Sequence, residues 1–160
     1  MRVKHEFDPI YNENSVILIL GSLPSVKSRD QNFYYGHPRN RFWQIIAKIC
    51  NSPVPMTISG KTDLCLDNRI ALWDVIESCD ITGSSDSSIK NVRLNDLSII
   101  FEKSDIKKIF LNGSAAYRFY KTGDFKDYPD AVRLPSTSPA NASYSFERLL
   151  GEWSIIKEYM

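Results

Sequence analysis

The sequence predicts a single α/β domain built on a parallel sheet, and three observations support this fold class. Residues 15–20 (SVILIL) form a continuous apolar, β-branched run, which is typical of a strand buried on both faces. Runs of this kind alternate with segments of helical periodicity, and this alternation favours a parallel sheet covered by helices on both faces. The 160 residues show no internal repeat and no linker, so we expect one domain over residues 1–160.

Each predicted strand is followed by a helix or by a polar loop. The strands are expected at 15–20, 70–75, 108–111 and 131–134, and the helices at 40–50, 61–68, 94–103, 114–120 and 143–159. The helix at 40–50 is predicted by apolar residues at positions 42, 45, 46 and 49, which share one helical face, and Ser114 is expected to cap the helix at 114–120. Long polar loops are expected at 21–39 and 82–88.

The net charge of +1 gives the chain no overall basic footprint. Any contact with nucleic acid must therefore depend on local patches and backbone amides. Aromatic residues make up 12% of the chain, which suits a site that stacks rings, although additional core aromatics explain the same number equally well.

Metal and membrane functions are not expected. The cysteines (Cys50, Cys65 and Cys79) are widely spaced, and only His5 and His37 could join them, so we predict neither a zinc site nor an iron–sulfur cluster. No apolar run approaches the ~18 residues of a membrane helix. The N-terminal residues show no signal-peptide pattern, and we expect a cytoplasmic protein.

The loop that follows the first predicted strand, residues 21–25 (GSLPS), is the first candidate site. Gly21 permits close approach of another group, and Ser22 and Ser25 offer hydroxyls and backbone donors. Such a loop can bind a phosphate, a base edge or a water. It lacks the lysine of a phosphate-binding Walker loop and the glycines of a dinucleotide loop, and a plain tight turn also explains it.

A second candidate site is the tract at 34–43 (YYGHPRNRFW), which is dense in aromatic and basic residues. Tyr35 can stack on a base, and Arg39 and Arg41 can hold phosphates. The Asn40 amide can pair with a base edge or orient a water, but Asn40 also stands where a helix cap belongs.

The third candidate is the loop at 134–141 (LPSTSPAN), in which two prolines stiffen a segment rich in hydroxyls. Its hydroxyl and N–H groups can contact DNA phosphates. A rigid turn before the last helix is the alternative. Because ligands of parallel sheets bind beyond the carboxyl ends of the strands, we expect all three loops to meet at one edge, together with Asp74 and Asn112.

Other chemistries are weakly supported. A serine hydrolase needs a base to activate its nucleophile, but the chain has no GxSxG motif and only His37 is a plausible base. Asp74 and Asp86 can hold a water or orient a loop, although solvated or capping carboxylates are the simpler interpretation.

Taken in order, the three motifs resemble those of the uracil-DNA glycosylase superfamily, and most closely its hypoxanthine (deoxyinosine) DNA glycosylase branch. The intervening segments ALWDVIESCDITGSSDSSI and IFLNGSAAYRFY are also similar, so that the resemblance covers residues 16–141. Each motif alone is weakly specific, whereas the ordered set is strongly specific.

The resemblance implies a three-layer αβα sandwich with a four-stranded parallel sheet and a base pocket at its carboxyl edge. It also implies a monomeric enzyme that binds damaged DNA, flips out a deaminated base and cuts its N-glycosidic bond without a metal or cofactor, as in base excision repair. Uracil-specific relatives carry Asp or Asn in the first loop, and many members carry His in the late loop. Here GSLPS and Ser136–Ser138 occupy these places, while Asn40 matches the asparagine of the hypoxanthine branch.

We therefore expect excision of hypoxanthine. A uracil- or mismatch-directed glycosylase and a non-catalytic nucleic-acid or nucleotide-binding module are the alternatives. Catalytic roles are predicted for Asn40, Ser22 and Ser25. Base contacts are predicted for Gly21, Leu23, Pro24, Tyr35, His37, Phe42 and Asn112. DNA contacts are predicted for Ser28, Arg39, Arg41, Ser136, Thr137, Ser138, Pro139 and Asn141.

Overall fold

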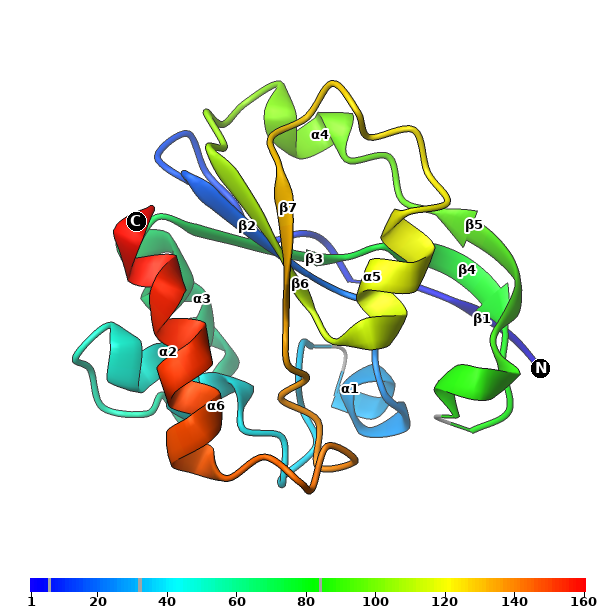
Figure 1. Ribbon diagram of the computed structural model, residues 1–160, viewed down its shortest axis with the longest axis horizontal. Coiled ribbons are helices and arrows are strands. Elements are labelled where there is room, and N and C mark those ends of the chain that lie inside the picture. Colours follow the sequence, from blue (N-terminus) through cyan, green and yellow to red (C-terminus); the bar gives the residue numbers. More distant parts are fainter. Residues whose placement is uncertain (6, 32, 84) are drawn as a thin grey trace.

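A four-stranded parallel sheet lies at the centre of the protein, with strand order β3-β2-β6-β7 (Figure 1). The computed structural model describes residues 1–5, 7–31, 33–83 and 85–160. The strands are β2 (Ile17–Gly21), β3 (Ile70–Asp74), β6 (Lys108–Asn112) and β7 (Ala131–Leu134). The predicted α/β class and its four parallel strands are confirmed.

The two strands at the start of this order explain why their sequences show no polar alternation. Every residue of β2 and of β3 is buried, because helices cover both faces of the sheet. β7 lies at the edge and is only partly buried. The carboxyl ends of all four strands meet at one edge, which is where the candidate loops begin.

The helices form the outer layers of a sandwich. They are α1 (Val26–Gln31), α2 (Phe42–Ile49), α3 (Ile58–Asp67), α4 (Ser98–Phe101), α5 (Ser114–Tyr120) and α6 (Phe146–Trp153), with short 3₁₀ segments at Asp86–Ser88 and Ser154–Glu158. Figure 1 shows α2, α3 and α6 gathered on one side of the sheet and α5 on the other. The apolar stripe predicted on α2 is buried at all four of its positions. This arrangement is the three-layer fold that the sequence resemblance implies.

A second, three-stranded antiparallel sheet was not predicted. It has the order β1-β4-β5 and consists of β1 (Arg2–Lys4), β4 (Ile76–Asp80) and β5 (Lys90–Leu94). Only Val75 separates β3 from β4, so the chain passes from one sheet to the other without a turn signal. β1 and β5 are short and mostly exposed, and their sequences therefore lack the apolar pattern of a strand.

Several predicted boundaries are wrong for local reasons. α1 lies inside the segment expected to be a loop, and its sequence VKSRDQ buries only Ser28. The helix predicted at 94–103 is reduced to α4, because Leu94 ends β5 instead. Ser114 does not cap α5: Gly113 is the N-cap residue, and no side chain caps this helix.

Candidate functional site

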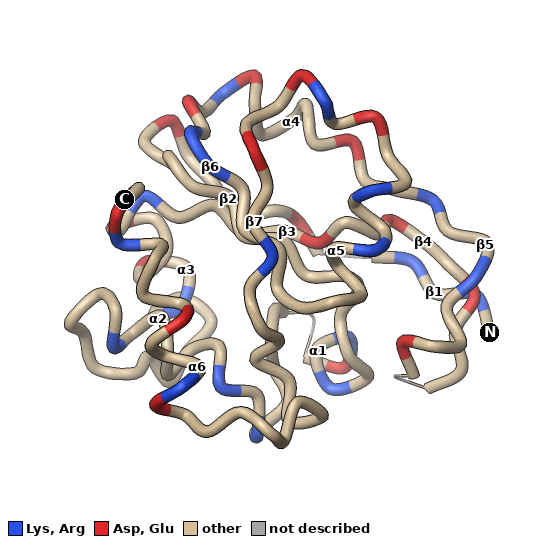
Figure 2. The backbone as a smooth tube through the Cα atoms, in the orientation of Figure 1, with Lys and Arg blue, Asp and Glu red and all other residues tan. Residues whose placement is uncertain are grey.

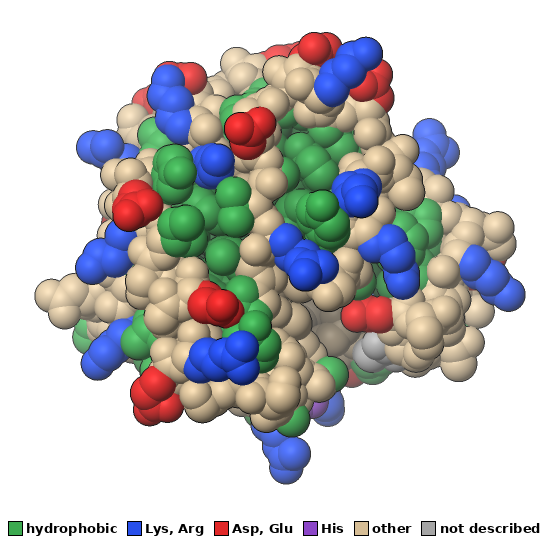
Figure 3. All heavy atoms as spheres, viewed as in Figure 1, with side chains coloured by type: hydrophobic (Ala, Val, Ile, Leu, Met, Phe, Trp, Pro, Cys, Tyr) green, Lys and Arg blue, Asp and Glu red, His purple; other side chains and the backbone are tan. Residues whose placement is uncertain are grey.

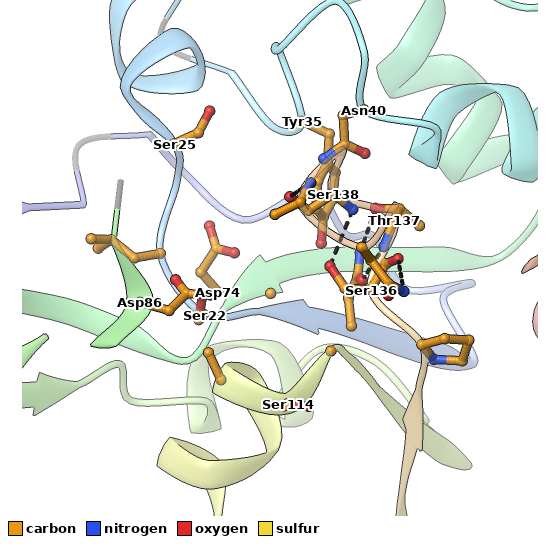
Figure 4. A pocket seen from close by; sticks show the side chains of 18 of the residues that line it. Ser22, Ser25, Tyr35, Asn40, Asp74, Asp86, Ser114, Ser136, Thr137 and Ser138 are labelled. Carbon is orange, nitrogen blue, oxygen red and sulfur yellow. Dashed lines mark hydrogen bonds between the residues drawn. The ribbon is translucent and has the colours of Figure 1, made fainter. Parts of the chain in front are cut away.

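A pocket of about 650 Å³ opens at the carboxyl edge of the four-stranded sheet. Its walls come from the loops that follow β2, β3, β6 and β7, together with residues of the tract at 34–40. Figure 4 shows side chains from these segments converging on a shared space. The volume lies within the range of ~300–1,000 Å³ that small-molecule sites occupy. The three candidate loops therefore do meet at one cavity.

Gly21 ends β2 at the floor of this pocket. A Cβ atom at this position would lie 2.4 Å from Oδ1 of Asp74 and 3.0 Å from the hydroxyl of Tyr35. A side chain here is excluded by these two oxygen atoms, and glycine is required for the close approach. The carboxylate and the hydroxyl consequently flank the same point of the floor.

The backbone of the first loop presents free donors to the pocket. The carbonyl oxygens of Gly21 and Ser22 accept from the N–H groups of Val75 (2.8 Å) and Ile76 (3.0 Å), which fixes the loop against the start of β4. The N–H groups of Ser22 and Leu23, by contrast, donate to no residue that the structure describes. Because both residues line the pocket, these donors are available to a ligand.

The hydroxyls of Ser25 and Ser28, further along the chain, form hydrogen bonds within the protein. Oγ of Ser25 accepts from the N–H of Ser28 (3.1 Å) and donates to the Ser28 hydroxyl (3.2 Å). Oγ of Ser28 in turn accepts from the N–H of Gly36 (2.8 Å), and Ser28 is only 1% exposed. The predicted DNA contact of Ser28 therefore needs correction: its hydroxyl joins the first loop to the tract at 34–40.

A buried pair of ionisable groups, His5 and Asp74, lies behind the pocket floor. Oδ2 of Asp74 is 2.7 Å from Nε2 of His5, and the two side chains are 5% and 2% exposed. A buried carboxylate is stabilised by a partner of this kind, since it would otherwise lose its hydration without compensation. Oδ1 is left without a hydrogen bond among the described residues, at the point where Asp74 lines the pocket.

Tyr35 supplies the second polar atom of the floor. Its ring stacks on Phe42 with centroids 4.0 Å apart, and its backbone has a left-handed φ of 53°. Its hydroxyl is buried near the Asn112 amide but forms no hydrogen bond with a described residue. Burial, followed by the nearby charge of Asp74, raises the pKa of Tyr35 well above its ordinary value. The hydroxyl therefore remains a neutral donor, and it has no partner until a ligand enters.

Asn40 lies on the opposite wall, and the two ends of its amide have different environments. Oδ1 accepts from the N–H of Phe42 (2.9 Å), the first residue of α2, which orients the side chain. Nδ2 has no hydrogen-bond partner among the described residues, and Asn40 lines the pocket. The helix-end contact and the free donor thus coexist in one side chain (Figure 4).

Asn112, at the end of β6, holds the late loop in place. Its Nδ2 donates to Oγ1 of Thr137 (3.0 Å), and its Oδ1 accepts from the N–H of Thr137 (3.1 Å). Thr137 is 1% exposed. Its hydroxyl is therefore directed at Asn112, and the predicted contact of Thr137 with DNA needs correction. Thr137 and its neighbours Ser136 and Ser138 all line the pocket.

Arg41 is an internal anchor of the same loop. Its guanidinium donates to the backbone carbonyls of Tyr144, Ser138 (3.1 Å) and Asn141 (3.1 Å). Nδ2 of Asn141 donates to the carbonyl of Ser136 (3.0 Å), which closes the loop on itself. These contacts use three of the five N–H donors of the guanidinium, so Arg41 anchors the late loop, and its phosphate contact stays a prediction.

Two further contacts fix the base of the loop. Nε1 of Trp153, on α6, donates to the carbonyl of Pro135 (2.9 Å). Gly113 has a φ of 96°, and a Cβ atom on it would lie 3.0 Å from Cβ of Ser136. The loop can therefore pack this closely on the start of α5 only because position 113 is glycine.

Comparison with known proteins assigns the family. The family model of the uracil DNA glycosylase superfamily matches residues 9–157. The chain belongs to this superfamily. A protein of Methanosarcina acetivorans named hypoxanthine DNA glycosylase is 35% identical over 156 residues, covering 96% of this chain and 98% of that protein.

A second protein of that name, from Methanosarcina barkeri, is 33% identical over 140 residues, covering 86% of this chain and 88% of its own length. An NMR structure of a Methanosarcina acetivorans protein, described as a candidate uracil DNA glycosylase, has a TM-score of 0.83 and 34% identity, covering 98% of this chain and 96% of that one. The predicted superfamily, and with it the class of DNA glycosylases, is confirmed.

The remaining predicted residues of this glycosylase divide into some that line the pocket and others that lie around it. Nδ1 of His37 accepts from the N–H of Arg39 (3.0 Å), and neither residue lines the cavity. Phe42 is fully buried behind Tyr35, so it supports the stacking ring and does not touch the pocket. Leu23 and Pro24 line the cavity, whereas Pro139 does not.

No motif or periodicity pointed to a site role for His5, which lies before the first predicted strand. Several residues that line the pocket were also not predicted as site residues, among them Ser114, Arg133 and Tyr144. Within the described ranges, no group of three or more His, Cys, Asp and Glu side chains could hold a metal ion. No described helix is long and apolar enough to span a membrane.

Proposed function

We propose that this glycosylase excises hypoxanthine from DNA by hydrolysing the N-glycosidic bond of deoxyinosine. The observation that carries the proposal is the free Nδ2 of Asn40, which faces a pocket whose floor holds the buried Asp74 carboxylate. The names of the two Methanosarcina relatives support the same base. The absence of Asp or Asn from the GSLPS loop argues against a uracil-specific site.

The polar atoms of the floor complement the edge of hypoxanthine, which presents an N1–H donor beside an O6 acceptor. Oδ1 of Asp74 can accept the N1–H, and the neutral hydroxyl of Tyr35 can donate to O6. Adenine presents the reverse pattern, with an acceptor at N1. Its lone pair would face the carboxylate, and this unpaired contact in a buried site is costly.

Guanine shares the N1–H and O6 groups, but its 2-amino group needs an additional acceptor. The second carboxylate oxygen of Asp74 is held by Nε2 of His5 at 2.7 Å. With one oxygen turned toward His5, the carboxylate does not present both of its oxygens to the N1–H and 2-amino donors of guanine. The pair of His5 and Asp74 therefore favours hypoxanthine over both normal purines.

Bond cleavage places negative charge on the departing base and positive charge on the sugar. The N–H groups of Ser22 and Leu23 and the Nδ2 of Asn40 are donors fixed in advance, and such donors stabilise developing negative charge. An amide is not a general base at neutral pH, so Asn40 acts by orienting the water or by holding the base. Ser22 and Ser25 contribute through the loop they shape.

The base reaches the pocket by flipping out of the duplex, at a cost of a few kcal/mol that is lower for a mispaired base. Ser136, Ser138 and Asn141 line the pocket and would contact the strand, together with the exposed Arg39. We expect the enzyme to act on damaged DNA as a monomer, without metal or cofactor, in the cytoplasm.

A panel of labelled duplexes containing inosine, uracil, xanthine or only normal bases tests this function. We expect alkali-labile strand breaks in the inosine duplex and none in the normal one. Breaks confined to the uracil duplex would show that the base is wrong. Tight binding to the lesion without any breaks would instead identify a non-catalytic binding module.

A further inference from the structure

A second groove adjoins the base pocket on the side of α5 and β7. Its volume is about 570 Å³. Its lining consists of Asp86, Ser87, Ser114, Ala115, Tyr117, Arg118, Lys121 and Arg133. Asp86, Ser114, Ala115 and Arg133 line both cavities, so the groove is continuous with the pocket mouth.

Three cationic side chains dominate this groove, and Figure 3 shows basic side chains gathered over α5 and β7. Arg118, Lys121 and Arg133 are all exposed. Arg133 and Lys121 lie over the ring of Tyr117, at 5.3 and 5.1 Å from its centroid. The aromatic ring positions these cations without neutralising them.

None of the three cations forms an ion pair with a described residue. Arg118 lies over the ring of Phe119 and donates to the backbone carbonyl of Asp86 (3.2 Å), not to its carboxylate. Asp86 is the single acidic residue of the lining, so three positive charges face one negative charge. In a chain with a net charge of +1, this local excess is large.

The cations near the opposite rim, Arg39, Arg41 and Arg148, do not line the pocket. Arg41, the cation nearest the late loop in the sequence motifs, is engaged by three backbone carbonyls. The late loop itself presents hydroxyls, amides and prolines. Of the described cations, Arg133 alone lines the pocket, and it belongs to the groove on the side of α5.

We propose that this groove binds the sugar–phosphate backbone of the strand that carries the extruded nucleotide, on one side of the lesion. The proposal extends the proposed function, because it concerns DNA at the same site. The three cations would contact phosphates, and the hydroxyls of Ser87 and Ser114 would add neutral contacts. These contacts carry no sequence information and act on damaged and undamaged DNA alike.

The test measures how DNA affinity depends on salt for the wild type and for the triple variant Arg118→Gln, Lys121→Gln and Arg133→Gln. Each lost phosphate contact makes the negative slope of log K against log [salt] less steep by about 0.9, so we expect the magnitude of the slope to decrease by roughly 2–3. A matched control, Lys48→Gln, Lys103→Gln and Lys157→Gln, removes the same charge from exposed positions outside both cavities. The control should leave the slope within about 0.5 of the wild type, and equal slopes for the two triple variants would overturn the proposal.

Duplexes with single uncharged methylphosphonate linkages locate the contacts. In the wild type, neutral linkages on one side of the lesion should weaken binding, and in the groove variant the same linkages should have no effect. An unchanged pattern in the variant would contradict the groove assignment. The salt dependence is also measured on undamaged duplex, so the groove is tested independently of base excision. A wild-type protein that excises no base would therefore refute the proposed function but not the proposed groove.

Discussion

The two asparagines at the pocket, Asn40 and Asn112, were both predicted as site residues, but the structure uses them differently. The amide of Asn112 is held at both ends, with its nitrogen and its oxygen each bonded to Thr137. The amide of Asn40 is engaged only through its oxygen, and its nitrogen faces the cavity. A polar side chain whose hydrogen bonds are satisfied holds structure, whereas a half-satisfied one at a pocket wall is available to substrate.

Asn40→Ala should give the largest effect on catalysis. Removing one fixed donor from a site that stabilises developing charge typically lowers the rate by ~10²–10³. Single-turnover excision from an inosine duplex at saturating enzyme measures this loss.

Asn40→Asp is the matched control for stability. Its carboxylate can still accept from the N–H of Phe42, but it has no donor for the base. We expect the thermal midpoint to stay near that of the wild type while the rate falls as in the alanine variant. Loss of stability with an unchanged rate would show that Asn40 is only a helix-end residue.

Asn112→Ala should act mainly on folding. It leaves the N–H and the hydroxyl of buried Thr137 without partners, and each unsatisfied buried group costs roughly 1–3 kcal/mol. Urea denaturation should show a loss of about 2–4 kcal/mol in the free energy of unfolding. We expect DNA affinity to fall more than the maximal rate of excision. If Asn112→Ala kept full stability and lost as much rate as Asn40→Ala, the two asparagines would not differ in role.

Thr137→Val removes only the hydroxyl end of the same contact. Nδ2 of Asn112 then lacks its acceptor, while the backbone N–H of residue 137 is still bonded. We expect a loss of about 1–2 kcal/mol, smaller than for Asn112→Ala. If both variants lost the same stability, the two hydrogen bonds would not act separately.

Tyr35→Phe should change the free energy of unfolding least, and it should raise it, whereas the asparagine and threonine variants lower it. Its hydroxyl is buried without a partner, so its removal should stabilise the free protein by up to ~1 kcal/mol while excision of hypoxanthine slows by roughly ten-fold. Thermal unfolding and single-turnover rates measure the two effects. A variant that is both less stable and equally active would contradict this role.

The pH dependence of stability follows from the raised pKa of Tyr35. The unfolded chain releases this proton near pH 10, whereas the folded chain retains it to higher pH. Stability from this group is therefore complete below pH 10 and is lost as pH rises above it. Tyr35→Phe should lose less stability than the wild type between pH 9 and pH 11.

The sequence was informative where local pattern and topology act together. The buried run at β2 and the rule that ligands bind beyond parallel strands predicted that Gly21, Asn112 and Ser136 meet at one edge, and the motif resemblance added Asn40; all four line the pocket. The identity of each residue also limited its chemistry, since an amide can donate and accept.

What the sequence could not supply was the partner of each group. Arg41 contacts carbonyls about 100 residues away, and His5 meets Asp74 across 69 positions. The sequence motif suggests that Arg41 binds phosphate, because the carbonyl groups that Arg41 contacts cannot be identified from the sequence. The sheet formed by β1, β4 and β5 was missed because pairing, not composition, defines its short exposed strands.

The contact between Trp153 and Pro135 gives the last helix an influence beyond the core. Trp153 is fully buried on α6, and its indole fixes the carbonyl that begins the late loop. Replacing Trp153 would thus loosen the late loop, which we propose contacts the DNA strand. Changes in the packing of the C-terminal helix are therefore expected to reach the pocket edge through this one hydrogen bond.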